Sequence, residues 1–340
     1  MGNFITYRQL AIIVPVYNVE KYLGSMIQSV LDQSFIDYVL ILINDGSTDN
    51  CLSVLNEFKE RDKRVVVIDK ENNGPGSARN AGLDYIKNKG LKFDYIWFCD
   101  SDDLIEPQSL EKVIGAMNRN HADYGLISVK RFDKNNVKIY PASIIKDTLL
   151  SRKDIVRQYF RWGIKWRKEP CSEAFLNNKF FRYDKIKDFR FREDIYRAED
   201  FDFFIKVIPF LERGVLVPNA YYMYRLRKSS LTNAIKNTGD LKVCLEHYSN
   251  LDLRSSDEKS AIQHKLIRAF YLEICDTWCS RDYTRYKQRL EEFMLFKFKY
   301  KYRATDIKIL SLLKFKSMLP IFINLRNKTK STRSTSDFFD

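Results

Sequence analysis

The most reactive arrangement of side chains in the sequence is an Asp-Ser-Asp-Asp turn at residues 100–103, directly after an apolar run at residues 95–99. An apolar segment of this length that ends in acids is typical of a buried strand whose carboxyl end carries carboxylates into a crevice. Carboxylates this close together repel one another unless a cation lies between them, and hard divalent ions prefer oxygen ligands. The pattern therefore predicts a divalent metal that carries phosphates. The structural alternative is a solvated acidic turn that caps the helix expected near Pro107.

Length and composition set bounds on the kind of protein that carries this turn. At 340 residues the chain exceeds the usual size of one domain, so we expect one large domain with a smaller one attached. Its 45% hydrophobic content suffices for a packed core and argues against disorder except at the ends. The 58 Lys and Arg against 44 Asp and Glu leave a net charge of +14, which favours nucleic acid, an anionic membrane or phosphorylated small molecules as partners.

The cysteines and the N-terminal residues indicate a cellular compartment. The six Cys are scattered, and the closest pair, Cys275 and Cys279, does not have the Cys-x-x-Cys spacing of a zinc ribbon. We therefore expect free thiols in a reducing cytoplasm. Residues 1–9 contain no apolar signal segment, and the chain has no uncharged apolar stretch of about twenty residues that would span a bilayer. The sequence thus predicts a cytoplasmic protein.

The first 130 residues alternate between apolar, β-branched segments and segments with helical periodicity. Strands are expected at residues 10–16, 38–43, 64–68 and 95–99. Helices are expected at residues 22–31 and 52–58, where apolar residues recur at helical spacing, and at residues 75–86, a segment interrupted by glycines. Asn18 is expected to cap the first of these helices. This order, with short turns, predicts an α/β fold with a mostly parallel sheet and helices on both faces.

Polar groups follow each expected strand, at the edge of the sheet where ligands of such folds bind. Tyr17 can stack on a ring, Asp45 can accept a hydrogen bond from a base or ribose, and Arg79 can pair with phosphate or hold an acid in place. Taken singly, each has a structural explanation, such as a turn at Asp45 or an ion pair at Arg79. Such groups at four adjacent strand ends instead favour one ligand-binding crevice. The groups are Pro15, Tyr17, Asn18, Asp45, Asn73, Gly74, Gly76, Arg79, Asn80 and the acidic turn.

Four motifs in this order resemble the family 2 glycosyltransferases of bacterial polysaccharide synthesis. They are Ile-Val-Pro-Val-Tyr-Asn at 13–18, Asn-Asp-Gly-Ser-Thr-Asp at 44–49, Asn-Gly-Pro-Gly-Ser-Ala-Arg-Asn-Ala-Gly at 73–82 and the acidic turn at 100–103. The match covers residues 9–130 closely. The resemblance implies a GT-A fold, a nucleotide-diphosphate sugar donor that is usually UDP-linked, a Mn²⁺ or Mg²⁺ ion, and inversion at the anomeric carbon.

The resemblance also implies roles for residues in the crevice. Pro15, Tyr17, Asp45 and Arg79 fall where the family holds the nucleoside, and Asp100 falls near the ribose or the sugar. Together with neighbouring strand-end groups, the residues expected to bind the donor are Pro15, Tyr17, Asn18, Asp45, Asn73, Gly74, Arg79, Asp100 and Ser101. The expected metal ligands are Asp102 and Asp100.

Inverting sugar transfer needs a base that takes a proton from the acceptor hydroxyl as it attacks opposite the leaving diphosphate. Asp200 begins an expected amphipathic helix, where the helix dipole stabilises an ionised acid. Phe191 and Glu193 resemble the family's Phe-x-Glu motif, and Glu199 with Asp200 resembles its Glu-Asp block. We therefore expect Asp200 to be the base, with Glu199 shaping the acceptor site and Asp194 as the second choice. The structural alternative is that these acids only stabilise a helix dipole.

A Tyr-rich segment at residues 222–232 resembles the family strand that is followed by Arg and Ser. Arg227 and Ser230 fall where relatives close over the diphosphate, and a cation with a hydroxyl suits that leaving group. Arg225 is the alternative for the cationic role.

The last third of the chain has helical periodicity, and residues 297–333 combine eleven Lys or Arg with one acid and many apolar residues. Such a basic amphipathic stretch can lie on an anionic membrane surface. The alternatives are a helix docked on the catalytic domain and a contact in a homo-oligomer.

These features predict a GT-A domain at residues 1–235, with a nucleotide-sugar half at 1–130 and an acceptor half at 131–235, and a helical region at 236–340. The predicted reaction is inverting, metal-dependent transfer of a hexose or N-acetylhexosamine from a UDP-sugar to a lipid-linked glycan, on the inner face of a bacterial membrane. A sugar nucleotidyltransferase would carry a Gly-rich loop after the first strand, where this chain has Pro-Val-Tyr-Asn at residues 15–18. A non-catalytic nucleotide or glycan binder should have lost Asp102 or Asp200, and both acids are present. Nucleic acid is not expected, because the basic residues concentrate in an apolar C-terminal segment.

Overall fold

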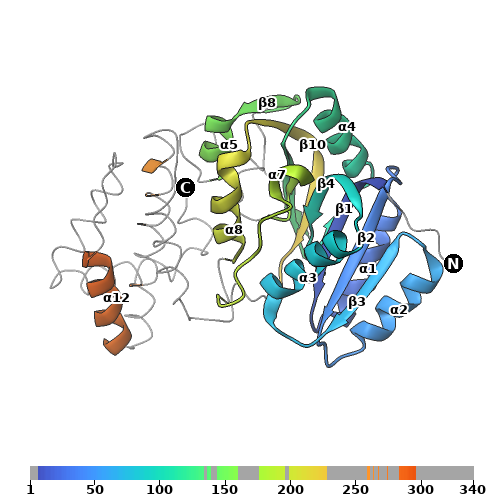
Figure 1. The fold of residues 1–340 in the computed structure, drawn as a ribbon, viewed down its shortest axis with the longest axis horizontal. Helices are drawn as coiled ribbons and strands as arrows, with labels where there is room; N and C mark the ends of the chain where they lie inside the picture. Colours follow the sequence, from blue (N-terminus) through green and yellow to red (C-terminus); the bar gives the residue numbers. More distant parts are fainter. Residues whose placement is uncertain are drawn as a thin grey trace.

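The computed structural model describes residues 7–133, 136–138, 144–159, 176–195, 199–227 and 283–295, together with residues 259, 260, 263, 267 and 274. Ten strands of this part form one sheet with helices against it (Figure 1). The strands are β1 (Tyr7–Val16), β2 (Tyr38–Asp45), β3 (Val65–Lys70), β4 (Lys92–Phe98), β5 (Leu104–Ile105), β6 (Tyr124–Phe132), β7 (Val137–Lys138), β8 (Thr148–Ser151), β9 (Lys179–Arg182) and β10 (Arg213–Arg225). The helices are α1 (Glu20–Leu31), α2 (Cys51–Arg61), α3 (Gly74–Asn88), α4 (Ser109–Asn120), α5 (Arg152–Tyr159), α7 (Tyr183–Ile186), α8 (Glu199–Val207), the 3-10 helix η1 (Ile208–Phe210) and α12 (Tyr283–Leu295).

The strand order is β3-β2-β1-β4-β9-β6-β10-β5, with β7 beside β6 and β8 beside β10. The four strands expected from the sequence are present, and β3, β2, β1 and β4 are parallel to their neighbours. The other half of the sheet is mixed, because β9 runs antiparallel to both β4 and β6, whereas β6 and β10 are parallel. The parallel half therefore carries the expected nucleotide-binding turns, and β9 follows directly beside it.

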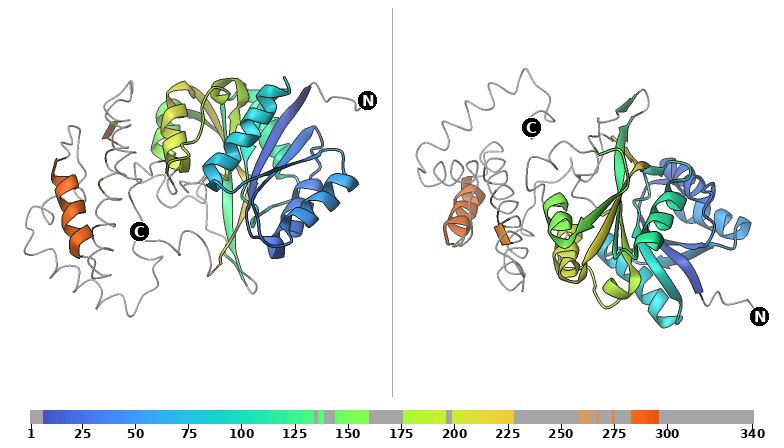
Figure 2. Two further views of the ribbon diagram at one scale, coloured as in Figure 1. Left: turned by 60° about the horizontal axis from the view of Figure 1, so that its bottom comes forward. Right: turned by 90° about the horizontal axis from the view of Figure 1, so that it is seen from above.

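Two hydrophobic clusters lie on opposite faces of the sheet, because successive side chains of a strand point to opposite sides. Ile12 of β1 belongs to the cluster that includes residues of α1, α2 and α4, and Ile13 belongs to the cluster that includes residues of α3, α5 and α8. Figure 2 shows these helices on both sides of the sheet. Helix α3 approaches β1 closely at Gly82, where an added Cβ atom would lie 2.8 Å from Cγ2 of Ile13. The glycine in this motif therefore has a packing role.

The expectation that Asn18 caps α1 is wrong. Val19 is the residue that precedes the helix, and its side chain makes no capping hydrogen bond; the backbone N–H of Glu20 instead donates to Oδ2 of Asp49 at 3.0 Å. Asn18 instead adopts a left-handed backbone conformation, with a φ angle of 50°, and its Oδ1 accepts a hydrogen bond from the backbone N–H of Thr48 at 2.8 Å. Its own backbone N–H donates to Oγ of Ser47 at 3.2 Å. The side chain is therefore used to join the β1–α1 turn to the β2–α2 turn.

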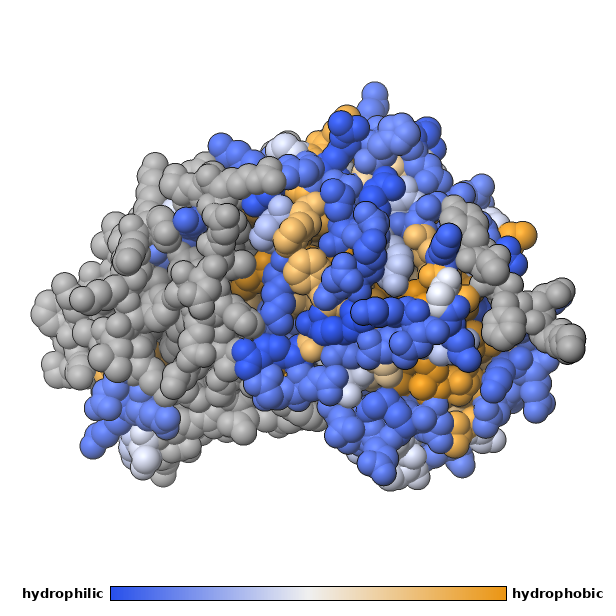
Figure 3. Space-filling model, in the orientation of Figure 1, coloured by the Kyte–Doolittle hydropathy of each residue, from blue (hydrophilic) through white to orange (hydrophobic). Residues whose placement is uncertain are grey.

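The described residues beyond residue 258 are all helical. Ile267, Ile274, Tyr286 and Leu290 are buried and belong to the same hydrophobic cluster as residues of α5 and α8. Within the described residues, no helix has both the length and the apolar character needed to cross a membrane. The face seen in Figure 3 is mainly hydrophilic where it is coloured, with separate apolar patches. The basic segment at 297–333 and Ser230 lie outside the described residues, and the proposed division into domains stays a prediction.

Candidate active site

The carboxyl ends of β1, β2 and β4 lie level with one another in the sheet. Pro15 pairs with Ile43 of β2, and Ile13 pairs with Phe98 of β4, so the turns that follow these strands meet at one edge. Tyr17 is 47% exposed at this edge, and Pro15 is half-buried. The exposed ring of Tyr17 is therefore available to stack on a planar ligand group.

Asp45, at the end of β2, is buried and accepts three hydrogen bonds through its carboxylate. Oδ1 accepts from Nζ of Lys70 at 2.6 Å and from the backbone N–H of Asn73 at 3.1 Å. Oδ2 accepts from the backbone N–H of Gly74 at 2.8 Å. Asp45 thus fixes the turn between β3 and α3, which contains two of the predicted donor-binding residues.

Arg79 of α3 joins the acidic turn to α8. Its buried guanidinium donates from Nη1 to Oε1 of Glu199 at 2.8 Å and from Nη2 to Oδ1 of Asp100 at 3.2 Å. The ring of Phe191 lies 5.4 Å from the guanidinium carbon and covers it. A buried arginine whose planar guanidinium donates hydrogen bonds to two carboxylates is held rigidly. One arginine, Arg79, therefore joins Glu199, which is next to the predicted base, to Asp100, the acid predicted near the ribose or the sugar.

Asp200 lies in the first turn of α8, beside Glu199. Burial, and then repulsion by the carboxylate of Glu199, raise the pKa of Asp200 from 3.8 to about 7, although Arg79 acts in the opposite direction. Its Oδ1 accepts a hydrogen bond from the backbone N–H of Phe201 at 2.7 Å. A carboxylate with this pKa can take a proton near neutral pH. Asp194, the second choice, is instead exposed and paired with Arg192, which lowers its pKa.

Asp102 forms an ion pair with Arg227, with 2.5 Å between Oδ2 and Nη2. Arg225 is held differently, because its Nε donates to the backbone carbonyl of Asp102 at 2.6 Å and its guanidinium lies 5.0 Å from the ring of Tyr22 and 4.5 Å from that of Phe132. Arg225 is thus enclosed by aromatic rings. Of the two arginines, Arg227 is the one whose guanidinium contacts the carboxylate of a predicted metal ligand.

Asp103, the third acid of the turn, has a structural position that the sequence did not distinguish. It is 1% exposed, and it accepts hydrogen bonds from the hydroxyl of Tyr222 and from the backbone N–H of Arg225, each at 2.7 Å. Burial, and then the charge of Asp102, raise its pKa well above the usual value. The same hydroxyl accepts from the backbone N–H of Asp100 at 3.3 Å. Asp103 and Tyr222 therefore attach the acidic turn to β10.

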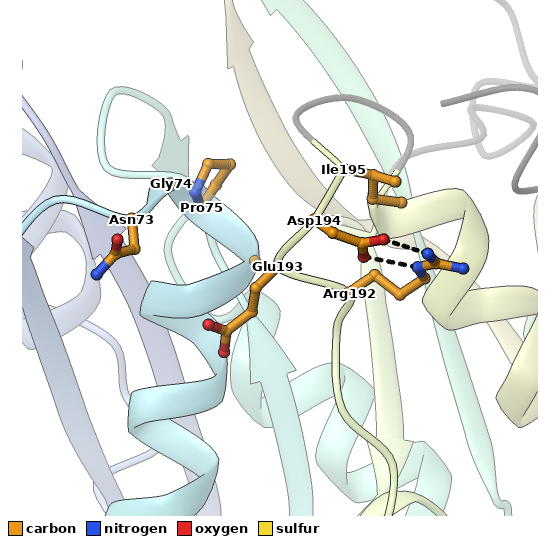
Figure 4. Close-up of a pocket in the computed structure, with 8 residues that line it drawn as sticks. Asn73, Gly74, Pro75, Arg192, Glu193, Asp194 and Ile195 are labelled. Atoms are coloured by element: carbon orange, nitrogen blue, oxygen red, sulfur yellow. Dashed lines mark hydrogen bonds and ion pairs between the residues drawn. The ribbon is translucent and has the colours of Figure 1, made fainter. Parts of the chain in front are cut away.

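A cavity of about 230 Å³ opens between residues 73–76, at the start of α3, and residues 192–195. Figure 4 shows Glu193 turned toward α3 and Asp194 turned toward Arg192. Glu193 accepts a hydrogen bond from Nδ2 of Asn80 at 2.8 Å. An added Cβ atom on Gly76 would lie 2.8 Å from the backbone oxygen of Arg192, so only glycine allows this approach. The cavity extends the crevice from the predicted donor-binding turn toward α8.

Comparison with known proteins identifies the family. The family model described as glycosyl transferase family 2 matches residues 11–188, more than half of the chain. The chain belongs to glycosyl transferase family 2. Its match with the glycosyltransferase GlyA of Streptococcus pneumoniae is 30% identical over 66% of this chain and 31% of GlyA. The minor teichoic acid biosynthesis protein GgaB of Bacillus subtilis is 27% identical over 64% of this chain and 23% of GgaB. This family 2 chain therefore spans only part of the length of these relatives.

The fold of this family 2 chain is similar to that of solved structures. The crystal structure of S. aureus TarS 1-349 in complex with UDP-GlcNAc has a TM-score of 0.62 and 20% sequence identity, over 78% of this chain and 80% of TarS. The expected GT-A fold is confirmed, with a mixed α/β sheet flanked by helices.

The acids of this family 2 site fit a divalent ion that is shared with a diphosphate. Mg²⁺ in nucleotide sites uses one or two carboxylates together with substrate phosphates. Asp102 already attracts a cation, and its pKa is raised by burial and then by the charge of Asp100. Among the described residues, no group of three or more His, Cys, Asp or Glu is placed to hold a metal. Asp102 and Asp100 would therefore need oxygen ligands from the nucleotide.

The structure places the predicted site residues in two groups. The first is the β1, β2 and β3 turns, with Tyr17, Asp45 and Gly74, and the second is the connected set around Arg79 and Asp100. Ser101 is buried, and Ser230 lies outside the described residues. Sequence reasoning missed the residues that support these acids. They are Lys70, Asp103, Asn177 and Tyr222; Asp103 lay in the acidic turn and Tyr222 in the Tyr-rich segment, whereas Lys70 and Asn177 lay in no recognised motif.

Proposed function

We propose that this protein is an inverting glycosyltransferase that moves a hexose or N-acetylhexosamine from a UDP-sugar to a hydroxyl of a glycan acceptor. The observation that carries the proposal is the connected set of Asp100, Arg79, Glu199 and Asp200, in which a base with a pKa of about 7 is tied to the acidic turn. The complex of TarS with UDP-GlcNAc supports a nucleotide-sugar donor for the shared fold.

In the proposed reaction, Asp200 accepts the proton of the acceptor hydroxyl as its oxygen bonds to the anomeric carbon. The bond from that carbon to the diphosphate breaks at the same time, which inverts the configuration. Arg79 holds Glu199 and Asp100 in place, and Glu199 adjoins Asp200 in the first turn of α8. Arg227 offers a guanidinium to the developing charge on the leaving diphosphate, for which a bidentate cation is suited.

A Mn²⁺ or Mg²⁺ ion bound by Asp102, with Asp100 nearby, would neutralise charge on the diphosphate. Asp102 already pairs with Arg227 through one of its two carboxylate oxygens. The two cations therefore compete for one carboxylate, and transfer of Arg227 to the diphosphate relieves the competition.

The proposed acceptor is a lipid-linked glycan in bacterial surface polysaccharide synthesis. The name of the relative GgaB, a minor teichoic acid biosynthesis protein, supports a cell-surface product. The basic amphipathic segment at 297–333 supports attachment to the anionic inner face of the membrane, where such acceptors are made.

The test is release of UDP from a panel of UDP-sugars in the presence of Mn²⁺, with NMR of the product to assign the anomeric configuration. We expect release with at least one donor and the opposite configuration in the product. Asp200→Asn should abolish transfer while UDP affinity stays near normal, because the base does not contact UDP. Retention of configuration, or full turnover by Asp200→Asn, would contradict the mechanism.

A further inference from the structure

Asn177 lies beside Asp100, on the side of the crevice away from the predicted nucleoside turns. It precedes β9, which runs antiparallel to β4, with Trp97 opposite Phe180. This pairing brings Asn177 to the end of β4, and Nε1 of Trp97 donates to its backbone oxygen at 2.6 Å. Asn177 is 3% exposed. Its position is therefore fixed by the sheet.

One half of the Asn177 amide supports Asp100. Nδ2 donates to Oδ2 of Asp100 at 3.0 Å, while Arg79 occupies Oδ1 of the same carboxylate at 3.2 Å. This interaction also sets the orientation of the amide, because the opposite orientation would place the amide oxygen against a carboxylate. Asp100 is thus held from both sides.

The other half of this amide is unused. Oδ1 of Asn177 is buried and accepts no hydrogen bond. Buried polar atoms without a partner are rare and costly, and they are found where a ligand or water completes the bonding. The adjacent Asn178 provides a contrast, because its Nδ2 donates to the carbonyl of Ile127 at 3.0 Å and its Oδ1 accepts from Nζ of Lys179 at 2.6 Å. The unused oxygen of Asn177 is therefore not a general feature of this segment.

The chemistry of this oxygen selects the kind of ligand group. An amide oxygen only accepts, so it can bind a hydroxyl or an amide N–H but not a phosphate oxygen. In the sheet, β4 separates β9 from β1 and β2, so Asn177 lies on the opposite side of Asp100 from Asp45. Helix α8, which carries the proposed base, packs over this side, with the ring of Phe203 5.6 Å from that of Phe98. The proposed reaction requires the transferred sugar to lie between Asp100 and α8, and the hydroxyl and N–H groups of a sugar are donors of the required kind.

We propose that Oδ1 of Asn177 accepts a hydrogen bond from a hydroxyl or N–H group of the transferred sugar, so that Asn177 is a specificity residue for the donor. The inference rests on the proposed function. Nδ2 keeps Asp100 oriented while Oδ1 recognises the sugar, so one side chain links the acid to the sugar. A donor that lacks the matching group leaves the amide oxygen unpaired.

The experiment compares binding of UDP with binding of UDP-GlcNAc and UDP-glucose by calorimetry in Mn²⁺, for the wild type and Asn177→Ala. Loss of one buried hydrogen bond lowers binding affinity by about 5- to 20-fold, so the affinity of Asn177→Ala for the sugar nucleotide should fall by that factor. Its affinity for UDP should fall by a smaller factor, because Arg79 still holds the other oxygen of Asp100 and UDP lacks the sugar. Asn178→Ala is the matched control, which should lower thermal stability but leave the ratio of the two affinities unchanged.

Mono-deoxy analogues of the bound sugar nucleotide provide a second measurement on the wild type, which does not require a variant to fold. We expect the wild type to bind one of these analogues more weakly than the complete sugar nucleotide, by the same factor as above. Asn177→Ala should bind that analogue and the complete sugar nucleotide with equal affinity, as in a double-mutant cycle. Equal loss of UDP and sugar-nucleotide affinity in Asn177→Ala, or full affinity of every deoxy analogue, would overturn the inference. Failure of the wild type to bind UDP at all would instead overturn the proposed function.

Discussion

Replacing Asp200 by Asn should make the protein more stable at alkaline pH and inactive in transfer. Burial, and then the charge of Glu199, raise the pKa of Asp200 to about 7 in the folded protein. The folded state therefore holds this proton more tightly than the unfolded chain does. As the pH rises from about 4 to about 7, the folded protein loses stability at this site, because a buried carboxyl group must ionise. Asn cannot ionise, so the variant avoids that loss.

The size of the effect follows from the pKa difference. A rise from 3.8 to about 7 is roughly three units, at about 1.4 kcal/mol for each unit. The free energy of unfolding of Asp200→Asn should therefore exceed that of the wild type by up to about 4 kcal/mol at pH 8, and by nearly nothing below pH 4. In the wild type, the rate of transfer should rise with pH through an apparent pKa near 7, because only the ionised acid accepts a proton.

The assay is urea unfolding of both proteins at pH 5 and pH 8, with the transfer rate measured on the same samples. The stability difference between variant and wild type should grow by about 2–3 kcal/mol over this range. Asp194→Asn is the matched control, because Arg192 lowers the pKa of Asp194, so this variant should gain no stability at alkaline pH. Equal stabilities of Asp200→Asn and the wild type at pH 8 would refute the assignment of a buried, proton-retaining base.

Further predictions concern the cation site, the α3 turn and the C-terminal segment. Arg227→Gln should bind Mn²⁺ alone more tightly than the wild type, measured by electron paramagnetic resonance, because the variant frees the carboxylate of Asp102. The control Arg61→Gln, at an exposed residue of α2, should bind Mn²⁺ as the wild type does. Equal Mn²⁺ binding by Arg227→Gln and the wild type would contradict the competition between the two cations. Gly76→Ala should lower the free energy of unfolding by about 1–3 kcal/mol, measured with urea, because its Cβ atom would lie 2.8 Å from a backbone oxygen. Truncation after Leu295 should reduce binding to anionic liposomes, and unchanged binding would exclude the segment as a membrane anchor.

The parallel half of the sheet could be predicted because its strands are long apolar runs and its helices have regular periodicity. The expected starts and ends lie within a few residues of β1, β2, β3 and β4. The mixed half could not be predicted, because β5, β7, β8 and β9 have two to four residues each and carry no readable alternation. The insertion of β9 beside β4 is set by tertiary pairing, and it brings Asn177 into the site.

The candidate site shows the same division between local and tertiary information. The sequence offered an ion pair or a phosphate contact for Arg79, and the structure shows ion pairs with Glu199 and Asp100. The family resemblance assigned Asp102 to the metal, but no feature of the sequence showed that Asp103 is buried against Tyr222 of β10. Asn18 was expected at a helix cap, a local motif, but the neighbouring turn at Thr48 competes for its side chain.

The central claim is that the acids at the strand ends bind a divalent cation together with a nucleoside diphosphate. Calorimetry of UDP with and without Mn²⁺, on the wild type and on Asp102→Ala, tests it most directly. We predict binding by the wild type that depends on Mn²⁺ and is weakened strongly in Asp102→Ala. Binding of UDP that is unchanged by Mn²⁺ and by the loss of Asp102, or no binding of any nucleoside diphosphate, would contradict the claim.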